Sequence, residues 1–538
     1  MVGAVERVTR VTGISRRSGW RRVAAVGAAV TVALGLVGCS DDLDAMPSDD
    51  EPATARSVEA SGPILDDIVT DVMAASEVPG VAVAVVHDGR VVIAEGYGVR
   101  ETGTDDAVDA ETVFQVASLS KPISSTVVAG AVGRGDVAWD QPVVELLPEF
   151  ELSDDYVTDH VTIADLYSHR SGLPGETAGN DLEQLGYERT EIVERLRYLP
   201  LAPFRSTYSY SNFGLTVGAV AAAAGYGTSF EQMADEVLFE PAGMTSTSFR
   251  HDDFITETNA AKLHVRIDET YRARFTRDAD AQAPAGGASS NVVDLARWMI
   301  LQLDEGRLDG EQIIDAASLA ASKRPFIRTD FESDPVELAA QSGLGWGVGT
   351  ASADASLVEW SHSGAFSAGA GTAVRLVPAL DLGIVVLTNA FVGAAEAIAD
   401  GYLDTVVNGQ ASIDWFADGW GPLFAGILVP PVHTPPATIT AARDVSAYVG
   451  TYANDYLGEV AVRETPTGLE IAAGPGLVTV IAVEHFDADT FVGTTAPEIE
   501  GARSLFVFEF DGGAERATRL LFEAGDDVAP WAVLTRAD

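Results

Sequence analysis

Apolar runs divide the chain into segments with different predicted structures. Gly80 to Arg100 contains two β-rich runs around Asp88-Gly89, a dipeptide that favours a tight hairpin turn. A second hairpin is predicted for Ala368 to Ala390, with its turn near Pro378 to Asp381. Most segments between the two hairpins have helical periodicity, for example residues 291–306. Because strands from both ends of this region flank a mainly helical middle, the pattern predicts an α+β fold.

The pattern changes after Asn408. Residues 415–436 are rich in proline, glycine and aromatic side chains, which is typical of a connecting segment. From Val445 onward short alternating strands follow one another, with turn signals at Thr467-Gly468 and Asp511-Gly512. The C-terminal part is therefore predicted to be a small antiparallel β domain.

The N-terminus has the pattern of an export signal. Residues 1–22 are rich in arginine, and the uncharged apolar run 23–38 ends at Cys39, the only cysteine in the chain. The run suits the apolar part of a signal peptide, and its junction with Cys39 resembles a bacterial lipobox. The alternative is an ordinary signal peptide followed by a lone buried cysteine. We expect an exported protein that is lipid-anchored at Cys39 to the outer face of the cytoplasmic membrane, or secreted.

Charge narrows the range of partners. The chain has 80 acidic and 34 basic residues, a net charge of −46, and its acidic residues 40–61 suit a flexible tether. Such a surface repels nucleic acid phosphates, so we expect no nucleic-acid partner. Adaptation to salt and an acidic proteome without salt both explain this composition.

Ser118 and Lys121 form the first candidate site. The only lysines of the chain are Lys121, Lys262 and Lys323. The apolar residues after Ser118 predict a helix, and Pro122 is tolerated only in its first turn. Ser118 then lies at the helix N-terminus, where backbone N–H groups favour an oxyanion, and Lys121 lies one turn on. A desolvated lysine can exchange a proton with the serine hydroxyl, whereas an arginine cannot.

Two further motifs follow in the chain, Tyr210-Ser211-Asn212 and His362-Ser363-Gly364. In this order, S-x-x-K, Y-x-N and a K/H-[TS]-G triplet resemble the serine β-lactamase and penicillin-binding protein superfamily, specifically its class C-like branch of esterases and D-aminopeptidases. The C-terminal module resembles the lipocalin-like domain often appended to these hydrolases. Surrounding segments that also resemble the family are residues 164–175, 240–249, 284–298 and 343–349.

The resemblance implies a β-lactamase/transpeptidase-like α/β/α sandwich with an antiparallel sheet and a helical subdomain, followed by a small antiparallel β-barrel. The implied parts are a lipoprotein signal peptide (1–38), a flexible acidic tether (39–62), a serine hydrolase domain (63–408), a linker (409–440) and a C-terminal lipocalin-like β-barrel domain (441–538).

The resemblance also implies roles for the catalytic groups. Ser118 is the implied acylated nucleophile, Lys121 holds or takes its proton, and Tyr210 acts as general base and proton shuttle. The backbone N–H groups of Ser118 and Ala365 are the implied oxyanion hole. His169, within residues 164–175, is expected to support structure. No metal-ligand spacing appears, and neither a metal nor another cofactor is expected.

The remaining implied residues bind substrate. Asn212 contacts the substrate amide or the lysine, while His362 and Gly364 line the pocket. A histidine is mostly neutral at pH 7, so recognition of a substrate carboxylate is weaker than with the lysine usual in drug-degrading β-lactamases. We therefore expect a small-molecule or short-peptide substrate with an ester or amide bond, D-amino-acid peptides among the candidates.

Two alternatives stay open. A penicillin-binding D,D-peptidase or β-lactamase would use the same residues on a β-lactam or cell-wall peptide. A non-catalytic binding protein would keep the fold without turnover.

Overall fold

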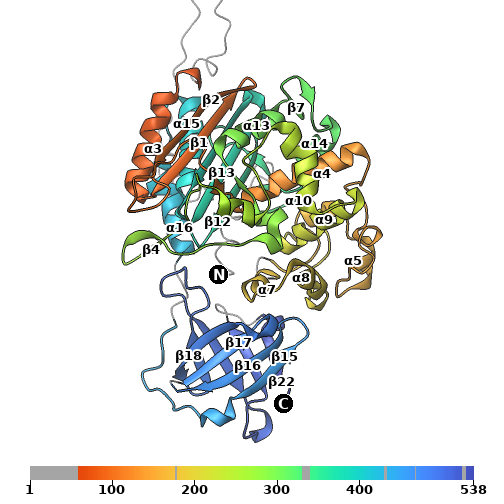
Figure 1. Ribbon diagram of the computed structural model, residues 1–538, viewed down its shortest axis with the longest axis vertical. Helices are drawn as coiled ribbons and strands as arrows, with labels where there is room; N and C mark the ends of the chain where they lie inside the picture. Colours follow the sequence, from red (N-terminus) through yellow and green to blue (C-terminus); the bar gives the residue numbers. More distant parts are fainter. Residues whose placement is uncertain (1–57, 176–177, 330–339, 429–432, 467, 524–528) are drawn as a thin grey trace, which may run out of the picture.

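The computed structural model describes residues 58–175, 178–329, 340–428, 433–466, 468–523 and 529–538. The predicted signal peptide 1–38, Cys39 and most of the tether 39–62 lie outside the described residues. A larger mixed domain and a smaller barrel lie one after the other along the long axis (Figure 1).

The larger domain is built on an antiparallel sheet with the strand order β2-β1-β14-β13-β12-β11-β10-β9. Both predicted hairpins are present, as β1–β2 and β13–β14, and they lie side by side because β1 pairs with β14 from Val81↔Thr388 to His87↔Leu382. The strands are β1 (Gly80–His87), β2 (Arg90–Gly98), β9 (Ile327–Arg328), β10 (Gln341–Ser342), β11 (Gly347–Thr350), β12 (Val358–Phe366), β13 (Ala370–Val377) and β14 (Leu382–Thr388).

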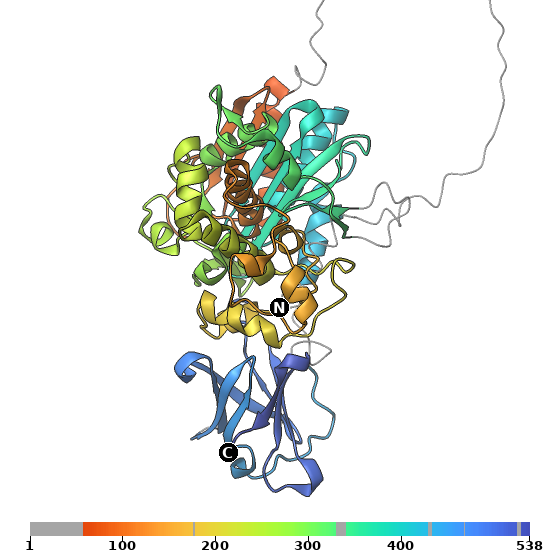
Figure 2. The same cartoon turned by 90° about the vertical axis from the view of Figure 1, so that its right-hand side faces the viewer.

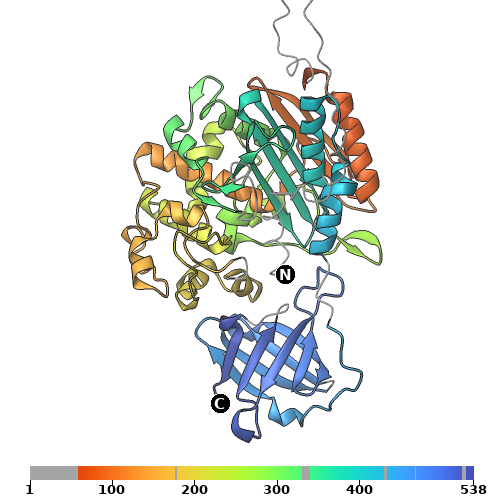
Figure 3. The same cartoon turned by 180° about the vertical axis from the view of Figure 1, so that it is seen from behind.

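Helices cover both faces of this sheet. Seen from behind, α3 (Gly62–Ser76), α15 (Ala394–Asn408) and α16 (Gly421–Ile427) lie across one face (Figure 3). The other face packs against α4 (Ser120–Arg134), α13 (Val292–Leu303) and the remaining helical region (Figure 2). Because side chains alternate across a strand, β1 supplies Ala82, Ala84 and Val86 to one apolar core, and Val81, Val83 and Val85 to the other. The predicted α+β fold is confirmed.

The helical region lies between the strands of the two hairpins in sequence. Its helices are α5 (Asp155–His160), α6 (Ile163–Tyr167), α7 (Asn180–Gln184), α8 (Arg189–Arg195), α9 (Asn212–Tyr226), α10 (Phe230–Ala234), α11 (Glu240–Ala242), α12 (His251–Thr256) and α14 (Ala316–Ser322). Short strand pairs are β3 (Phe114–Gln115) with β6 (Ser289–Ser290), β4 (His264–Ile267) with β5 (Thr270–Ala273), and β7 (Arg307–Leu308) with β8 (Glu311–Gln312).

Within the described residues no single helix is long and apolar enough to cross a membrane, while one bent pair, Asn212–Tyr226 with Phe230–Ala242, passes by length and composition only.

The predicted linker 409–440 needs a correction in its first half. Residues 415–427 form η9 (Trp415–Trp420) and α16, and the side chains of Trp420, Phe424 and Ile427 are buried in the core that includes α15. Proline and glycine suggested a connecting segment, but Pro422 lies in the first turn of α16, where a missing N–H costs nothing. This segment therefore belongs structurally to the larger domain.

The C-terminal module is a closed barrel. Its strands pair in chain order and β22 returns to β15, with Tyr452 opposite Arg536. The strands are β15 (Gly450–Asn454), β16 (Gly458–Thr465), β17 (Gly468–Ala473), β18 (Thr479–Asp487), β19 (Thr490–Gly493), β20 (Ser504–Glu509), β21 (Arg519–Glu523) and β22 (Val533–Arg536). The turn at Asp511-Gly512 lies between β20 and β21, whereas Thr467 of the other predicted turn lies outside the described residues. The predicted barrel is confirmed, and its likeness to lipocalins stays a prediction.

A buried charged cluster lies behind strand β12. The Arg375 guanidinium contacts Asp400 at 2.9 Å and Glu359 at 3.7 Å, and the Trp420 indole donates to Asp400 at 2.8 Å. Glu396 lies in the same cluster, and burial raises its pKa to about 7. Burial also raises the pKa of Glu359. A single guanidinium thus faces more carboxyl groups than it can neutralise, and protonation relieves the excess.

Glu396 is expected to make stability depend on pH. The folded state holds its proton more tightly than the unfolded chain, whose value is 4.5, so this stabilisation is complete below pH 4.5 and is lost as the pH rises through about 7. Between these values this group lowers the free energy of unfolding by about 1 kcal/mol for each pH unit. The free energy of unfolding of Glu396→Gln, measured with urea at several pH values, should fall less steeply with pH across this window than that of the wild type. Glu311→Gln, which removes an exposed carboxylate, is the control for net charge, and equal slopes in wild type and Glu396→Gln would contradict the assignment.

Candidate active site

Ser118 lies in a short turn that leads into helix α4. The turn, η1 (Ala117–Leu119), continues directly into Ser120, and Ala117 before the serine has a positive φ of 48°. A left-handed conformation is costly for alanine, so surrounding packing must hold it. The predicted placement of Ser118 at a helix N-terminus agrees with this geometry, and its side chain is half-buried.

Lys121 is buried next to the serine. Its ammonium donates hydrogen bonds to Ser118 Oγ at 3.0 Å and to the Ala285 carbonyl at 2.9 Å. The same Nζ lies 4.5 Å from the centroid of the Tyr210 ring. A buried ammonium needs such partners, and these direct its charge at the hydroxyl of Ser118.

Tyr210 is held in place by His169. The two rings lie 4.5 Å apart and are tilted by 31°, and Nδ1 of His169 accepts a hydrogen bond from the Ser211 N–H at 3.2 Å. Burial and the Lys121 ammonium lower the pKa of His169 well below its usual range, so the ring is neutral and can accept this bond. His169 thus has contacts of the supporting kind expected from the sequence.

Asn212 begins helix α9, two residues after Tyr210. Ser211 caps that helix by accepting from the Gly214 N–H at 3.0 Å, which fixes the direction of Asn212. The Asn212 amide nitrogen donates to Asn180 Oδ1 at 3.5 Å, a long contact. Its oxygen is buried without a hydrogen-bond partner in the part of the chain that the structure describes. This oxygen is therefore a candidate to accept a hydrogen bond from a substrate N–H.

His362 lies on β12 and its ring centroid is 6.4 Å from that of Tyr210. Surrounding protein and the Lys121 ammonium lower the pKa of His362 to about 3. Nδ1 lies 2.7 Å from the Ser363 carbonyl, which fits a neutral ring that donates from Nδ1 and keeps a lone pair on Nε2. At neutral pH this side chain offers no positive charge to a substrate.

Gly364 allows β12 to touch the turn that carries the nucleophile. A Cβ atom at this position would lie 2.5 Å from the Val116 carbonyl, 2.5 Å from Thr372 Oγ1 and 2.9 Å from the Leu119 nitrogen. No side chain fits in that space, so the strand can approach η1 only with glycine. The predicted oxyanion donor Ala365 is the next residue along the strand.

The end of β12 beside the turn lacks a strand partner on one side. β11 pairs with β12 only between Val358 and Ser361, while β13 pairs with it as far as Phe366. Within the described residues, 362–366 therefore have a strand on one side only. An extended substrate with backbone-like amide groups can align along such an edge.

The structure thus brings together residues from three distant parts of the sequence. Ser118, Lys121, Tyr210 and His362 are linked by the contacts above, Asn212 follows the tyrosine, and Gly364 contacts the nucleophile turn. Sequence reasoning missed Ala285 and Asn180. Ala285 acts through its carbonyl, from η6 (Ala283–Gly287), so no residue type could reveal it, although residues 284–298 had been marked by family resemblance.

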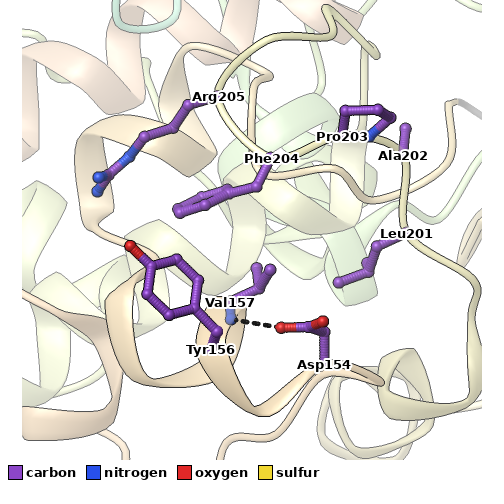
Figure 4. A pocket seen from close by; sticks show the side chains of 8 residues that line it. All are labelled: Asp154, Tyr156, Val157, Leu201, Ala202, Pro203, Phe204 and Arg205. Atoms are coloured by element: carbon purple, nitrogen blue, oxygen red, sulfur yellow. Dashed lines mark hydrogen bonds between the residues drawn. The ribbon is translucent and has the colours of Figure 1, made fainter.

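A surface hollow of about 620 Å³ opens elsewhere on the helical region (Figure 4). Its walls include Tyr156 and Phe204, and none of the predicted site residues lines it. No group of three or more His, Cys, Asp or Glu side chains within the described residues is arranged to hold a metal ion.

Comparison with known proteins extends over most of the chain. "Unguisins hydrolase ungD" of Aspergillus violaceofuscus is 24% identical over 516 residues, covering 86% of this chain and 88% of that protein. "Penicillin-binding protein 4" of Amycolatopsis lactamdurans is 27% identical over 392 residues, covering 70% and 93%. The solved structure of the octameric penicillin-binding protein homologue from Pyrococcus abyssi has a TM-score of 0.55 at 18% identity, covering 88% of this chain and 99% of that one.

The family itself is shown by a broader match. The sequence profile described as Beta-lactamase matches residues 65–408, more than half of the chain. This stretch contains the sheet, the helical region and all three motifs. The resemblance seen in the sequence is confirmed, and the chain belongs to the beta-lactamase family of serine hydrolases.

Proposed function

We propose that this protein is an exported serine hydrolase that forms an acyl-enzyme on Ser118 and acts on ester or amide substrates. The observation that carries the proposal is the contact of the buried Lys121 ammonium with Ser118 Oγ at 3.0 Å, beside the Tyr210 ring. A serine hydroxyl needs a proton acceptor to become a nucleophile, and this contact pairs it with groups that exchange protons.

In the acylation step Ser118 Oγ bonds to the substrate carbonyl carbon. The hydroxyl proton passes to Tyr210 in its phenolate form, which the adjacent Lys121 ammonium stabilises by its charge. The carbonyl oxygen takes up the electron pair of its π bond and becomes an oxyanion. The backbone N–H groups of Ser118 and Ala365 stabilise it, because fixed donors at such a position lower the barrier strongly.

The tetrahedral intermediate then collapses. The bond to the alcohol or amine breaks, and Tyr210 returns the proton to that leaving group. A water molecule attacks the acyl-enzyme by the same route, with its proton taken by Tyr210 and delivered to Ser118 Oγ. The products are a carboxylic acid and the regenerated serine.

The charge and the hydrogen-bonding groups of the site, together with two relatives, support this substrate class. His362 is neutral at the position where a lysine would meet a substrate carboxylate. Asn212 Oδ1 and the open edge of β12 suit a substrate with amide groups. The name of the relative "Unguisins hydrolase ungD" supports hydrolysis, and "Esterase EstB" of Burkholderia gladioli, 30% identical over 213 residues, supports ester substrates. Short D-amino-acid peptides stay among the candidates.

A second candidate function is that of a penicillin-binding D,D-peptidase or a β-lactamase. The relative "Penicillin-binding protein 4", most of whose length this chain matches, favours it. It would use the same nucleophile, and a labelled penicillin that becomes covalently attached to Ser118 would distinguish it from an esterase.

Substitution of the nucleophile tests the mechanism. We expect Ser118→Ala to lower kcat at least about 10³-fold on any substrate found among chromogenic esters, D-amino-acid amides and nitrocefin, because no other group can form the acyl-enzyme. A fluorophosphonate probe should label the wild type and the control Ser206→Ala, which changes an exposed serine, but not Ser118→Ala. Lys121→Arg should also be nearly inactive, because the larger, planar guanidinium cannot take the place of the buried ammonium that donates to both Ser118 Oγ and the Ala285 carbonyl. Unchanged turnover by Ser118→Ala would contradict the mechanism, and a wild type that the probe does not label would favour the non-catalytic binding protein.

A substitution at His362 tests the substrate preference. His362→Lys places a cation at the position of His362. The rate of acylation by nitrocefin, which carries a carboxylate, should therefore rise about tenfold relative to the rate with a neutral ester. His362→Gln, which stays neutral, should leave the ratio of the two rates near that of the wild type. Stopped-flow acylation rates provide the measurement, and an unchanged ratio in the lysine variant would contradict the assigned role.

Export and lipid anchoring at Cys39 are part of the proposal and rest on the sequence of residues 1–39. Expressed in a bacterium, the wild type should incorporate labelled palmitate and sediment with membranes, whereas Cys39→Ser should do neither. Equal incorporation in both would contradict lipidation at this residue.

A further inference from the structure

The turn between strands β15 and β16 of the C-terminal barrel contacts the helical region. Tyr456 lies between β15 and β16, and its side chain is buried against the start of α7. The Tyr456 hydroxyl donates to Asp181 Oδ1 at 2.6 Å and accepts from the Gly179 N–H at 2.7 Å. Figure 1 shows α7 and α8 between the barrel and the rest of the larger domain. The barrel therefore supplies both a donor and an acceptor to the first residues of α7.

Further contacts fix this turn of the barrel. Arg195 of α8 donates to the carbonyls of Asp455 and Tyr456, at 2.8 Å each, and the Tyr187 hydroxyl donates to the Leu457 carbonyl at 2.8 Å. One apolar cluster continues from Tyr187 into the barrel core. Satisfied hydrogen bonds within a continuous apolar contact make the turn a rigid support.

On its other side the start of α7 contacts the active site. Gly179, with a φ of 87°, lies against the Phe213 ring, where an added Cβ would come within 2.4 Å. The next residue, Asn180, accepts the hydrogen bond from the Asn212 amide. Residues 179–181 are therefore held between Tyr456 of the barrel and Asn212–Phe213 of the catalytic domain.

The same helix is also connected to the end of strand β12. Glu183 of α7 pairs with Arg277 and Gln282, and the Arg277 guanidinium lies over the Phe366 ring at the end of β12. The barrel also contacts the residue that follows β12, because Ser367 donates a hydrogen bond to Glu498 at 3.0 Å. A displacement of α7 would therefore shift the contacts of both Asn212 and β12.

We propose that Tyr456 is a positioning residue of the active site: by fixing residues 179–181 it sets Asn180 and, through Asn180, the side-chain amide of Asn212, whose oxygen is the candidate acceptor for a substrate N–H. This proposal rests on the proposed function, because it concerns the same acyl-transfer site. The barrel then contributes to the geometry of the active site, even though Tyr456 and Ser118 belong to different domains. Burial raises the pKa of Asp181 to about 6, and the Tyr456 hydroxyl is one of the donors that oppose this rise, together with the backbone N–H groups of Leu182 and Gly179.

The test compares Tyr456→Phe with the wild type on an amide substrate and on a small fluorophosphonate that reacts with Ser118 without needing Asn212. We expect kcat/KM for the amide to fall about tenfold through kcat, since a small misplacement of a substrate-binding group is costly. The rate of fluorophosphonate labelling should stay at the wild-type value. Thr479→Val is the matched control: it removes a hydrogen bond from the barrel to Leu185, beyond the end of α7, and should leave both rates unchanged.

A double-mutant cycle separates positioning from general destabilisation. Asn180→Ala, at a partly exposed position, should reproduce the loss seen in Tyr456→Phe, and the double variant should be no worse than either single one. Should Tyr456→Phe fail to fold, Asn180→Ala with normal amide turnover would still overturn the proposal. Wild-type turnover by Tyr456→Phe, losses that multiply in the double variant, or a fall in fluorophosphonate labelling equal to that for the amide would each overturn it too. A wild type that the probe does not label would instead contradict the proposed function itself.

Discussion

The contact between strand β12 and the nucleophile turn is the constraint on which the site depends. Gly364 lies against the backbone of Val116 and Leu119, closer than any side chain would allow. This approach brings the strand that carries His362 and Ala365 against the turn that carries Ser118, and it joins the sheet to the start of helix α4. The positive φ of Ala117 belongs to the same contact, because the turn must present Ser118 to the strand. Packing of a strand against a turn thus creates the geometry that the chemistry requires.

The electrostatics of the site depend on one buried cation, the ammonium group of Lys121. The Lys121 ammonium is directed at Ser118, at the Ala285 carbonyl and at the face of Tyr210. The same charge, together with burial, keeps His169 and His362 neutral, so each can serve as a hydrogen-bonding group without competing for protons at neutral pH. The buried carboxyl groups of Glu359, Glu396 and Asp400 are gathered around Arg375, whose charge also contributes to the low pKa of His362.

Helix α7 connects the barrel to the larger domain close to Asn212. Helix α7 is bonded to the barrel through Asp181, to α9 through Asn180 and to the segment after β5 through Glu183. A short helix with so few residues of its own has little intrinsic stability, so its position depends on these neighbours. The position of Asn212 therefore depends on contacts made far from Ser118 in the sequence.

The sequence by itself determined the elements whose signals are local. The Asp88-Gly89 hairpin, the helix after Ser118, the C-terminal strands and the three motifs follow from residue type and periodicity over a few positions, and family order joined the motifs into one predicted site. Only the tertiary structure decided the pairing of β1 with β14, the packing of residues 415–427 onto the sheet, and the roles of Ala285, Asn180 and Tyr456. These depend on contacts between residues far apart in the chain, and two of them act through a backbone carbonyl or a common polar side chain. Such contacts leave no mark in local composition, because their energy arises only when distant surfaces meet.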